Sequence, residues 1–470
     1  MKRITKILVL ALVVILLFGA VSSLAADPYD TYTYSIDGKP LASPAAYSAM
    51  EDFDSADMGL ANVSADIPQL KEANDIVSDE QANLYIADKG NNRIVVLNKF
   101  YEAVATISTY VDEYGNEQSL KEPQGLYVTD PTKTVSGESY IYVCDTGNLR
   151  IVIFDRNYQY VRTITKPDSP ILTEGAFKPC SIAVDIYGRI FIVSTASHEG
   201  VIVLSGDGDF TGFIGAQKVT YSLMQMVWRR FQTKEQREKQ ELNIATAYNN
   251  ITVDDNGFVY VTSDSIDPAK QLASLKSEAS TYSPVKKLNS QGIEIMKRNG
   301  FFDPGGEVVL NAIDVSQIVD VAIGQEGSWT IVDQKRSRFF TYDQNGNLLF
   351  AFGDNGDQLG NGQKFNAITY QIVEDEETGE EQYRLVALDN DSANGYKITV
   401  YTPTEYYDTI MSALKNQNEH DYSQSIIYWQ EVLTQNNNFD LAYIGIGKAL
   451  YNQGKYKEAM EKLADRKSVV

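Results

Sequence analysis

The chain has only two histidines, His198 and His420, and two cysteines among its 470 residues. Two histidines cannot build a multi-histidine metal centre, which excludes that class of catalytic site. Positive charge is also scarce, because 41 lysines and arginines face 63 aspartates and glutamates and leave a net charge of −22. Phosphate backbones and anionic lipid repel such a chain, so we expect no binding to nucleic acid.

One long apolar run stands at the amino terminus, where Lys2, Arg3 and Lys6 precede Ile7–Phe18. Ser23–Ala25 then fits the small-residue rule for signal cleavage. Residues 1–25 therefore predict a secretory signal peptide and an exported, extracellular or cell-surface protein. An uncleaved membrane anchor is the alternative, since the apolar character continues to nearly membrane-spanning length.

Cys144 and Cys180 are the only pair available for a disulfide. Export permits such a bond, but side chains on two separate strands rarely meet its geometry by chance. We therefore favour two buried, unpaired thiols.

Short β-rich runs recur along the middle of the chain, and most of them end in an acidic residue. The runs are Leu84–Asp88, Tyr140–Asp145, Phe191–Ser194, Phe258–Ser263, Ser328–Asp333 and Arg384–Asp389. Strands before and after each run, joined by turns such as Tyr187-Gly188 and Asn256-Gly257, complete a unit of about four strands. Such units bury both faces only by packing against one another around an axis. We therefore expect a mostly β protein with a six-bladed β-propeller over residues 27–403, Tyr32–Ile36 supplying the outer strand of the last blade.

Two of these units carry a Gly-Asn-x-Arg-Ile sequence, at Lys89–Ile94 and Thr146–Ile151. With the connectors Glu122–Gly125 and Phe177–Ser181, these segments resemble NHL repeats, whose fold is a β-propeller. Recurring arginines are expected to pair with the aspartate that ends the preceding strand. The expected structural pairs are Asp88 with Arg93, Asp145 with Arg150, and Asp333 with Arg338.

Residues 404–464 change to helical spacing, and Tyr422 and Tyr456 lie one 34-residue period apart. The second period resembles a tetratricopeptide repeat at positions that include Tyr443, Ile446, Gly447, Leu450, Gly454, Tyr456 and Ala459. We expect the small residues to let two helices approach closely and the large ones to fill the groove between them. Ser425, Trp429 and Val432 fit the first period.

The last six residues, 465–470, match the translation of a common sequencing adapter, so we expect a non-native tail and truncated tetratricopeptide repeats. Secreted proteins of Gram-positive bacteria that join NHL to tetratricopeptide repeats look similar, and such relatives continue into a membrane domain. The resemblance implies membrane association through a missing C-terminal segment, and a role beside carbohydrate ABC importers.

Asp207–Asp209 and Asp354–Asp357 carry oxygen ligands for calcium, but turn chemistry explains them equally well. We therefore expect no cofactor, with calcium as the alternative. Propeller lyases and quinoprotein dehydrogenases use several converging histidines, whereas the predicted propeller has only His198. A calcium-dependent lactonase of the six-bladed type is the better rival, and Asn74, Asn250 and Asp320 near the blade entries are candidates to line its channel.

An insert at about 217–245 carries a local positive excess and an aromatic cluster. Its amphipathic pattern predicts either a lid on one rim of the propeller or a contact with anionic head groups or with an acidic partner surface. Candidate contact residues are Trp228, Arg229, Arg230 and Phe231, with Tyr443 in the helical region. The leading hypothesis is a non-enzymatic scaffold that binds protein or glycan partners through the propeller rim and the tetratricopeptide module.

Overall fold

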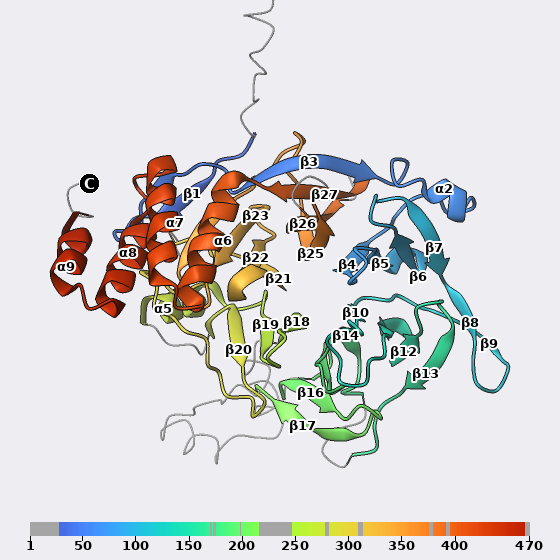
Figure 1. Ribbon diagram of the computed structural model, residues 1–470. Helices are drawn as coiled ribbons and strands as arrows, with labels where there is room; N and C mark the ends of the chain where they lie inside the picture. The colour runs from blue at the N-terminus through green and yellow to red at the C-terminus, as the bar shows by residue number, and fades with distance from the viewer. Residues whose placement is uncertain are drawn as a thin grey trace, which may run out of the picture.

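A computed structural model describes residues 28–169, 172, 175–197, 199–215, 247–277, 282–308, 314–375, 379–391 and 395–465. Six antiparallel sheets stand around a common centre in Figure 1, with the first strand of each sheet innermost. The fold is a six-bladed β-propeller with helices at the end of the chain, so the predicted fold class is confirmed.

Blades 1, 2 and 3 each have four described strands, blade 4 has three, and blades 5 and 6 recruit strands from the amino-terminal segment. Blade 1 consists of β4 (Ala73–Ser78), β5 (Leu84–Asp88), β6 (Arg93–Leu97) and β7 (Ala103–Ile107), and blade 2 of β10 (Leu126–Val128), β11 (Ile141–Asp145), β12 (Arg150–Phe154) and β13 (Tyr160–Ile164). Blade 3 consists of β14 (Pro179–Val184), β15 (Ile190–Ser194), β16 (Val201–Leu204) and β17 (Phe210–Ile214), and blade 4 of β18 (Asn250–Val253), β19 (Val259–Thr262) and β20 (Val285–Leu288). Blade 5 contains β21 (Ile318–Ile323), β22 (Trp329–Asp333), β23 (Arg338–Tyr342) and β24 (Leu348–Phe352), and blade 6 contains β25 (Phe365–Glu374), β26 (Glu381–Asp391) and β27 (Gly395–Pro403). A small hairpin, β8 (Thr109–Val111) and β9 (Glu117–Ser119), follows blade 1.

The second strand of a blade is buried on both faces, because a neighbouring blade covers each face. Every residue of β5, β11, β15 and β22 is buried. Apolar clusters accordingly span two blades, as where Tyr85 and Ile94 of blade 1 pack with Leu126 and Val143 of blade 2. Burial of apolar area between blades is the main favourable term in this fold.

The ring is closed by a strand other than the one we expected. β3 (Tyr47–Asp54) pairs with β27, from Asp54 opposite Lys397 to Tyr47 opposite Pro403. The expected segment, Tyr32–Ile36, instead contributes β1 (Tyr32–Tyr34), which pairs with β24 of blade 5 and with β2 (Pro40–Ala42). β3 has eight residues to match the nine of β27, whereas β1 has three and can bond only a short edge.

Four successive helices follow the propeller: α6 (Glu405–Asn418), α7 (Tyr422–Gln435), α8 (Asp440–Asn452) and α9 (Tyr456–Asp465). They stand beside blade 5 and β1 in Figure 1. Two shorter helices, α2 (Leu60–Val63) and α5 (Pro268–Ser277), lie in connections of the propeller region. None of the helices within the described ranges is long and apolar enough to cross a membrane.

The helices share a core with blades 5 and 6. The Tyr407 ring of α6 lies 4.9 Å from the Tyr47 ring and 5.9 Å from the Phe350 ring. The first turn of α6 is tied down as well, because the Thr404 hydroxyl accepts from the Tyr407 amide and donates to the Ala45 carbonyl at 2.6 Å. The helical part is therefore fixed on the propeller by both apolar and polar contacts.

Replacing Tyr407 with alanine removes a side chain that is 1% exposed at this junction. We expect a loss of about 3–5 kcal/mol in the free energy of unfolding, through lost burial and a residual cavity. Calorimetric unfolding measures it. Tyr451→Ala is the matched control, because that tyrosine is 62% exposed, and an equal loss in both variants would contradict the shared core.

Candidate functional site

The inner strands place one residue from each blade at an equivalent position along the central channel. These residues are Asp75, Gly125, Ser181, Asn250, Asp320 and Ala367. In each blade, the next residue along the inner strand is apolar and lines the channel. We call Asp75, Ser181, Asn250 and Asp320 the polar belt.

Side chains of the polar belt bond one blade to the next. Asp75 accepts from the Leu126 amide at 2.8 Å, and Asp320 accepts from the Ile368 amide at 2.7 Å. The Ser181 hydroxyl donates to the Asn250 oxygen at 2.5 Å, and the Asn250 nitrogen donates to Asp320 at 2.6 Å. The belt thus supplies polar contacts across four of the blade junctions.

Gly125 holds the belt position in blade 2, where the backbone of blade 3 comes too close for a side chain. A Cβ atom at this position would lie 2.5 Å from the Cys180 carbonyl oxygen and 2.7 Å from the Ser181 Cα. No other residue type fits there without moving blade 3.

Burial controls the ionisation of the two belt carboxyls, which are 8% exposed at Asp75 and 5% exposed at Asp320. Loss of hydration raises the pKa of Asp75 to about 7, against the opposing effect of its hydrogen bonds from the Leu126 and Ile76 amides. The pKa of Asp320 is raised well above its ordinary value by burial and by the charge of Asp75. Burial therefore favours the protonated form of both carboxyls.

Asp75, Asn250 and Asp320 of the belt line one end of a cavity of about 510 Å³ along the propeller axis. At the other end, where the inner strands turn into the second strands, the described lining includes Asp130, Asp254 and Glu326. There the Lys133 ammonium reaches from blade 2 to the Asp255 carboxylate of blade 4, at 2.9 and 3.0 Å from its two oxygens. The mouth is thus lined by charged side chains.

Of the three residues suggested for a lactonase channel, Asn250 and Asp320 come together in the belt. Asn74 does not, because its amide nitrogen donates to the Gln124 carbonyl at 2.9 Å. Sequence reasoning missed Asp75 and Ser181. The sequence did offer a signal for them. Asp75 directly precedes Ile76 and Ser181 directly precedes Ile182, at equivalent positions of blades 1 and 3.

The paired arginines of blades 1 and 2 are structural, as expected. Arg93 Nε lies 2.6 Å from Asp88 Oδ2, with both side chains almost fully buried, and Arg150 Nε lies 2.7 Å from Asp145 Oδ2. Each ion pair closes the turn between the second and third strands of its blade.

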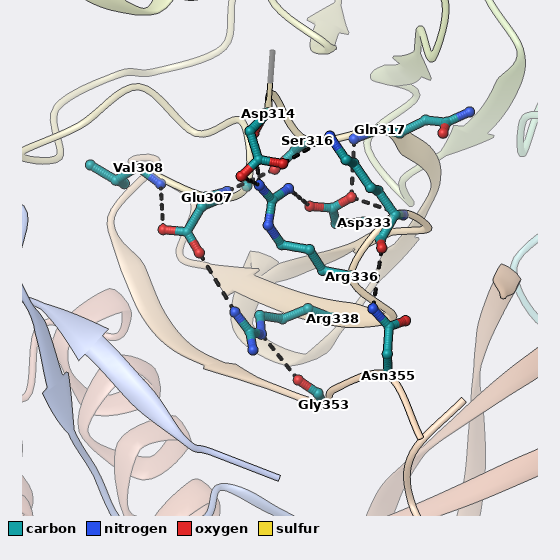
Figure 2. Close-up of polar contacts among 12 residues, drawn as sticks. Glu307, Val308, Asp314, Ser316, Gln317, Asp333, Arg336, Arg338, Gly353 and Asn355 are labelled. Carbon is teal, nitrogen blue, oxygen red and sulfur yellow. Dashed lines mark hydrogen bonds and ion pairs between the residues drawn. The ribbon is translucent and has the colours of Figure 1, made fainter. Parts of the chain in front are cut away.

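Blade 5 departs from the expected pairing of Asp333 with Arg338. Figure 2 shows Asp333 bonded to Arg336, at 2.8 Å, while Arg338 Nε donates to the Gly353 carbonyl at 3.0 Å and its guanidinium faces Glu307. Arg336 stands three residues after the aspartate, where blades 1 and 2 have Asn91 and Asn148. In blades 1 and 2, each asparagine donates to the aspartate oxygen that also pairs with the arginine of its blade. In blade 5 the longer Arg336 side chain stands at the asparagine position and pairs with Asp333 in place of Arg338.

The calcium candidates lie apart from the belt. Asp207 is exposed in the turn between β16 and β17, Asp354 lies 3.5 Å from the Arg338 guanidinium, and Asp357 accepts from Gln363. Across the described residues there is no group of three or more histidine, cysteine, aspartate or glutamate side chains placed to hold a metal ion. Cys144 and Cys180 are both buried, free thiols.

A second concave surface lies on the helices and has a volume of about 770 Å³. Its described lining is Gln417, His420, Tyr422, Gly447, Lys448, Tyr451, Asn452, Tyr456, Ala459, Met460 and Leu463. We call this surface the helical groove. Tyr451, Tyr456 and Met460 are 62%, 59% and 73% exposed.

Small residues let α8 and α9 approach closely, as predicted for positions 447 and 459. A Cβ atom at Gly447 would lie 2.8 Å from the Leu463 side chain of α9, and Ala459 is buried. Gly454 adopts a φ of +76°, which ends α8. Two expectations were wrong. Tyr456 is exposed and does not fill the space between helices. Tyr443, a candidate partner contact, is only 8% exposed, and its hydroxyl donates to the Asn437 carbonyl.

Other predicted contact residues lie outside the described ranges. These are Trp228, Arg229, Arg230 and Phe231 of the insert. His198 and the predicted signal segment also lie outside the described ranges.

Comparison with solved structures finds proteins of low sequence identity. Virginiamycin B lyase from Staphylococcus aureus is 10% identical, with 76% of this chain and 100% of that chain covered and a TM-score of 0.42. The Malassezia sympodialis allergen Mala s 1 is 12% identical, with 70% and 92% covered and a TM-score of 0.41. A structural genomics protein from Bacteroides thetaiotaomicron is 11% identical, with 80% and 75% covered and a TM-score of 0.42. At these identities nothing about ligands is taken from them. No protein-family model matches the sequence, and no curated protein matches it significantly.

The raised pKa of Asp75 makes stability depend on pH. The folded chain keeps this proton to about pH 7, whereas the unfolded chain loses it near pH 4, so the stabilisation is complete below pH 4 and is lost as pH rises to 7. One proton gives a slope of at most about 1.4 kcal/mol per pH unit. We expect Asp75→Asn to reduce this slope, leaving the part that comes from Asp320, in urea unfolding measured from pH 4 to 8. Asp207→Asn, at an exposed turn, should keep it, and a wild-type slope in Asp75→Asn would refute the assignment.

Proposed function

We infer that this protein is a non-enzymatic, exported scaffold whose helical groove binds a segment of a partner protein. The observation that carries this proposal is the exposure of Tyr451, Tyr456 and Met460 together in one concave surface. Large apolar side chains gathered on a surface are typical of interaction sites, whereas single ones are ordinary. Tyrosine and methionine are also enriched at protein interfaces.

The groove has a local charge unlike the rest of the chain. Lys448 and His420 line it, and no acidic side chain does among its described lining residues. The whole chain carries a charge of −22. A partner segment with apolar anchors and acidic flanks is therefore complementary to this surface.

The contacts that fix the helices on the propeller support a scaffold role. Asn418, at the end of α6, accepts from Gln344 at 2.7 Å and donates to Glu326 at 3.3 Å, and both partners line the axial cavity. Together with the Tyr407 contacts, this interaction holds the groove in one orientation relative to the propeller. A partner in the groove and a ligand on the propeller rim would be held at a fixed separation.

The sequence resemblance to secreted NHL–tetratricopeptide proteins of Gram-positive bacteria extends the proposal. It assigns the partner to a cell-surface assembly, with a carbohydrate ABC importer as the leading candidate and a glycan as an alternative ligand. Membrane association would then come from a further C-terminal segment.

A photo-crosslinking amino acid at position 456 tests the proposal in the producing bacterium. We expect position 456 to yield a discrete adduct with one partner, because this side chain is exposed in the groove. Mass spectrometry identifies the adduct, and an importer subunit would support the finer assignment. Met460→Glu should reduce the yield by about tenfold or more, since it places a charge among apolar contacts.

Position 114 is the matched control, because Tyr114 is 81% exposed on the β8–β9 hairpin, away from the helices. The same adducts at positions 114 and 456 would contradict a specific groove.

A calcium-dependent lactonase is the second candidate, favoured by the convergence of Asn250 and Asp320 at the end of the axial cavity. Against it, Asn250 turns its amide nitrogen, which is not a metal ligand, toward Asp320. We expect purified protein to hydrolyse gluconolactone no faster with calcium than with EDTA, measured by acid release. Calcium-dependent turnover that Asp320→Asn abolishes would replace the scaffold assignment.

A further inference from the structure

The axial cavity is lined by more acidic than basic side chains. Its described lining has six acidic side chains and two lysines, in a volume of about 510 Å³. The acidic side chains are Asp75, Asp130, Asp254, Asp255, Asp320 and Glu326. A narrow cavity with charge of one sign and low-dielectric walls focuses the field and concentrates ligands of the opposite sign.

The wall of this cavity already binds ammonium groups of the chain itself. Lys287 Nζ lies 3.1 Å from Asp254 Oδ2, 4.5 Å from the centre of the Phe258 ring and 4.8 Å from the centre of the Tyr260 ring. One carboxylate and two aromatic faces around an amine form a site typical of cation recognition. The Lys133 ammonium is held by a carboxylate alone, through both oxygens of Asp255.

At the other end of the cavity, the belt carboxyls of Asp75 and Asp320 have no lysine or arginine partner among the described residues. Their hydrogen bonds come from backbone amides and from Asn250. The belt therefore holds two carboxyls that burial keeps protonated and that a ligand cation would favour in the ionised form.

The two ends of the cavity are set apart by the length of an inner strand. Asn250 begins β18, and Asp254 and Asp255 follow its end. Four to five extended residues span about 13–16 Å. A linear molecule with amines at both ends can reach the belt and the mouth together.

We propose that the axial cavity binds a linear di- or polyamine, with one ammonium at Asp75 and Asp320 and another at the acidic mouth. The shape of the cavity, the cation contacts on its wall and the two belt carboxyls that have hydrogen bonds but no cationic partner within the described ranges all point to this ligand class. This site is separate from the helical groove and does not depend on the partner inferred above.

Binding of the amine is coupled to proton release. The ammonium stabilises the ionised belt carboxyls, so occupancy drives protons off Asp75 and Asp320, and affinity rises between pH 6 and 8. An aliphatic amine stays charged over this range. The other titratable groups that face the cavity are Asp130, Lys133, Asp254, Asp255, Lys287, Glu326, Tyr127, Tyr260, Tyr370 and Tyr383.

Titration calorimetry of the full chain with spermidine in 150 mM salt tests the proposal. We expect saturable one-site binding, with protons released in buffers of different ionisation enthalpy and an affinity that rises with pH. Asp320→Asn should weaken binding by about tenfold or more, since it removes a charge-assisted contact. Glu326→Gln, at the mouth, should weaken it by a smaller factor and provides a second variant should Asp320→Asn fail to fold.

Two controls separate this site from general attraction to an acidic protein. Asp207→Asn, at an exposed turn, should bind spermidine as the unaltered chain does. The uncharged 1,8-octanediol should not bind. The proposal is overturned by the absence of saturable binding, by equal binding of the diol, by wild-type affinity in Glu326→Gln and Asp320→Asn, or by an equal loss in Asp207→Asn. None of these results bears on the crosslinks from position 456.

Discussion

The bond from one inner strand to the next is the constraint on which this molecule depends. Each blade buries its middle strands only because a neighbour covers them, and the polar belt fixes how far apart successive inner strands lie at the axis. Asp75 and Asp320 contribute as hydrogen-bond acceptors in a site where full charge is costly. The same two residues thereby set the geometry of the ring and the electrostatic character of its cavity.

The helices extend this constraint to a second surface. Their core is continuous with blades 5 and 6, and Asn418 bonds to residues that line the axial cavity. Small residues such as Gly445, where a Cβ atom would lie 2.4 Å from the Trp429 ring, let successive helices pack closely. The groove and the cavity are consequently parts of one continuous packing arrangement.

The sequence predicted what repeats. Strands buried on both faces give near-continuous apolar runs, so six blades were visible, and helical spacing identified α7 to α9. It could not predict features set by competition between equivalent groups. Arg336 and Arg338 are both within reach of a preceding aspartate, and only the turn geometry decides between them. Asn250 and Asp320 of the polar belt were predicted as channel residues, whereas Asp75 and Ser181 were missed, because the four residues differ in type and share only an equivalent position in their blades.

Closure of the ring by β3 has a consequence for how the chain folds during synthesis. Lys397 of β27 and Asp52 of β3 form an ion pair across 345 residues of sequence. β3 emerges from the ribosome before any blade exists and must keep an unsatisfied edge until the last blade is made. Contacts between such distant segments form slowly, although the entropy of joining the ends grows only with the logarithm of the intervening length. The nascent chain is thus most exposed to wrong strand pairing through the whole interval before its final sheet is complete, which is when a holding chaperone would matter most.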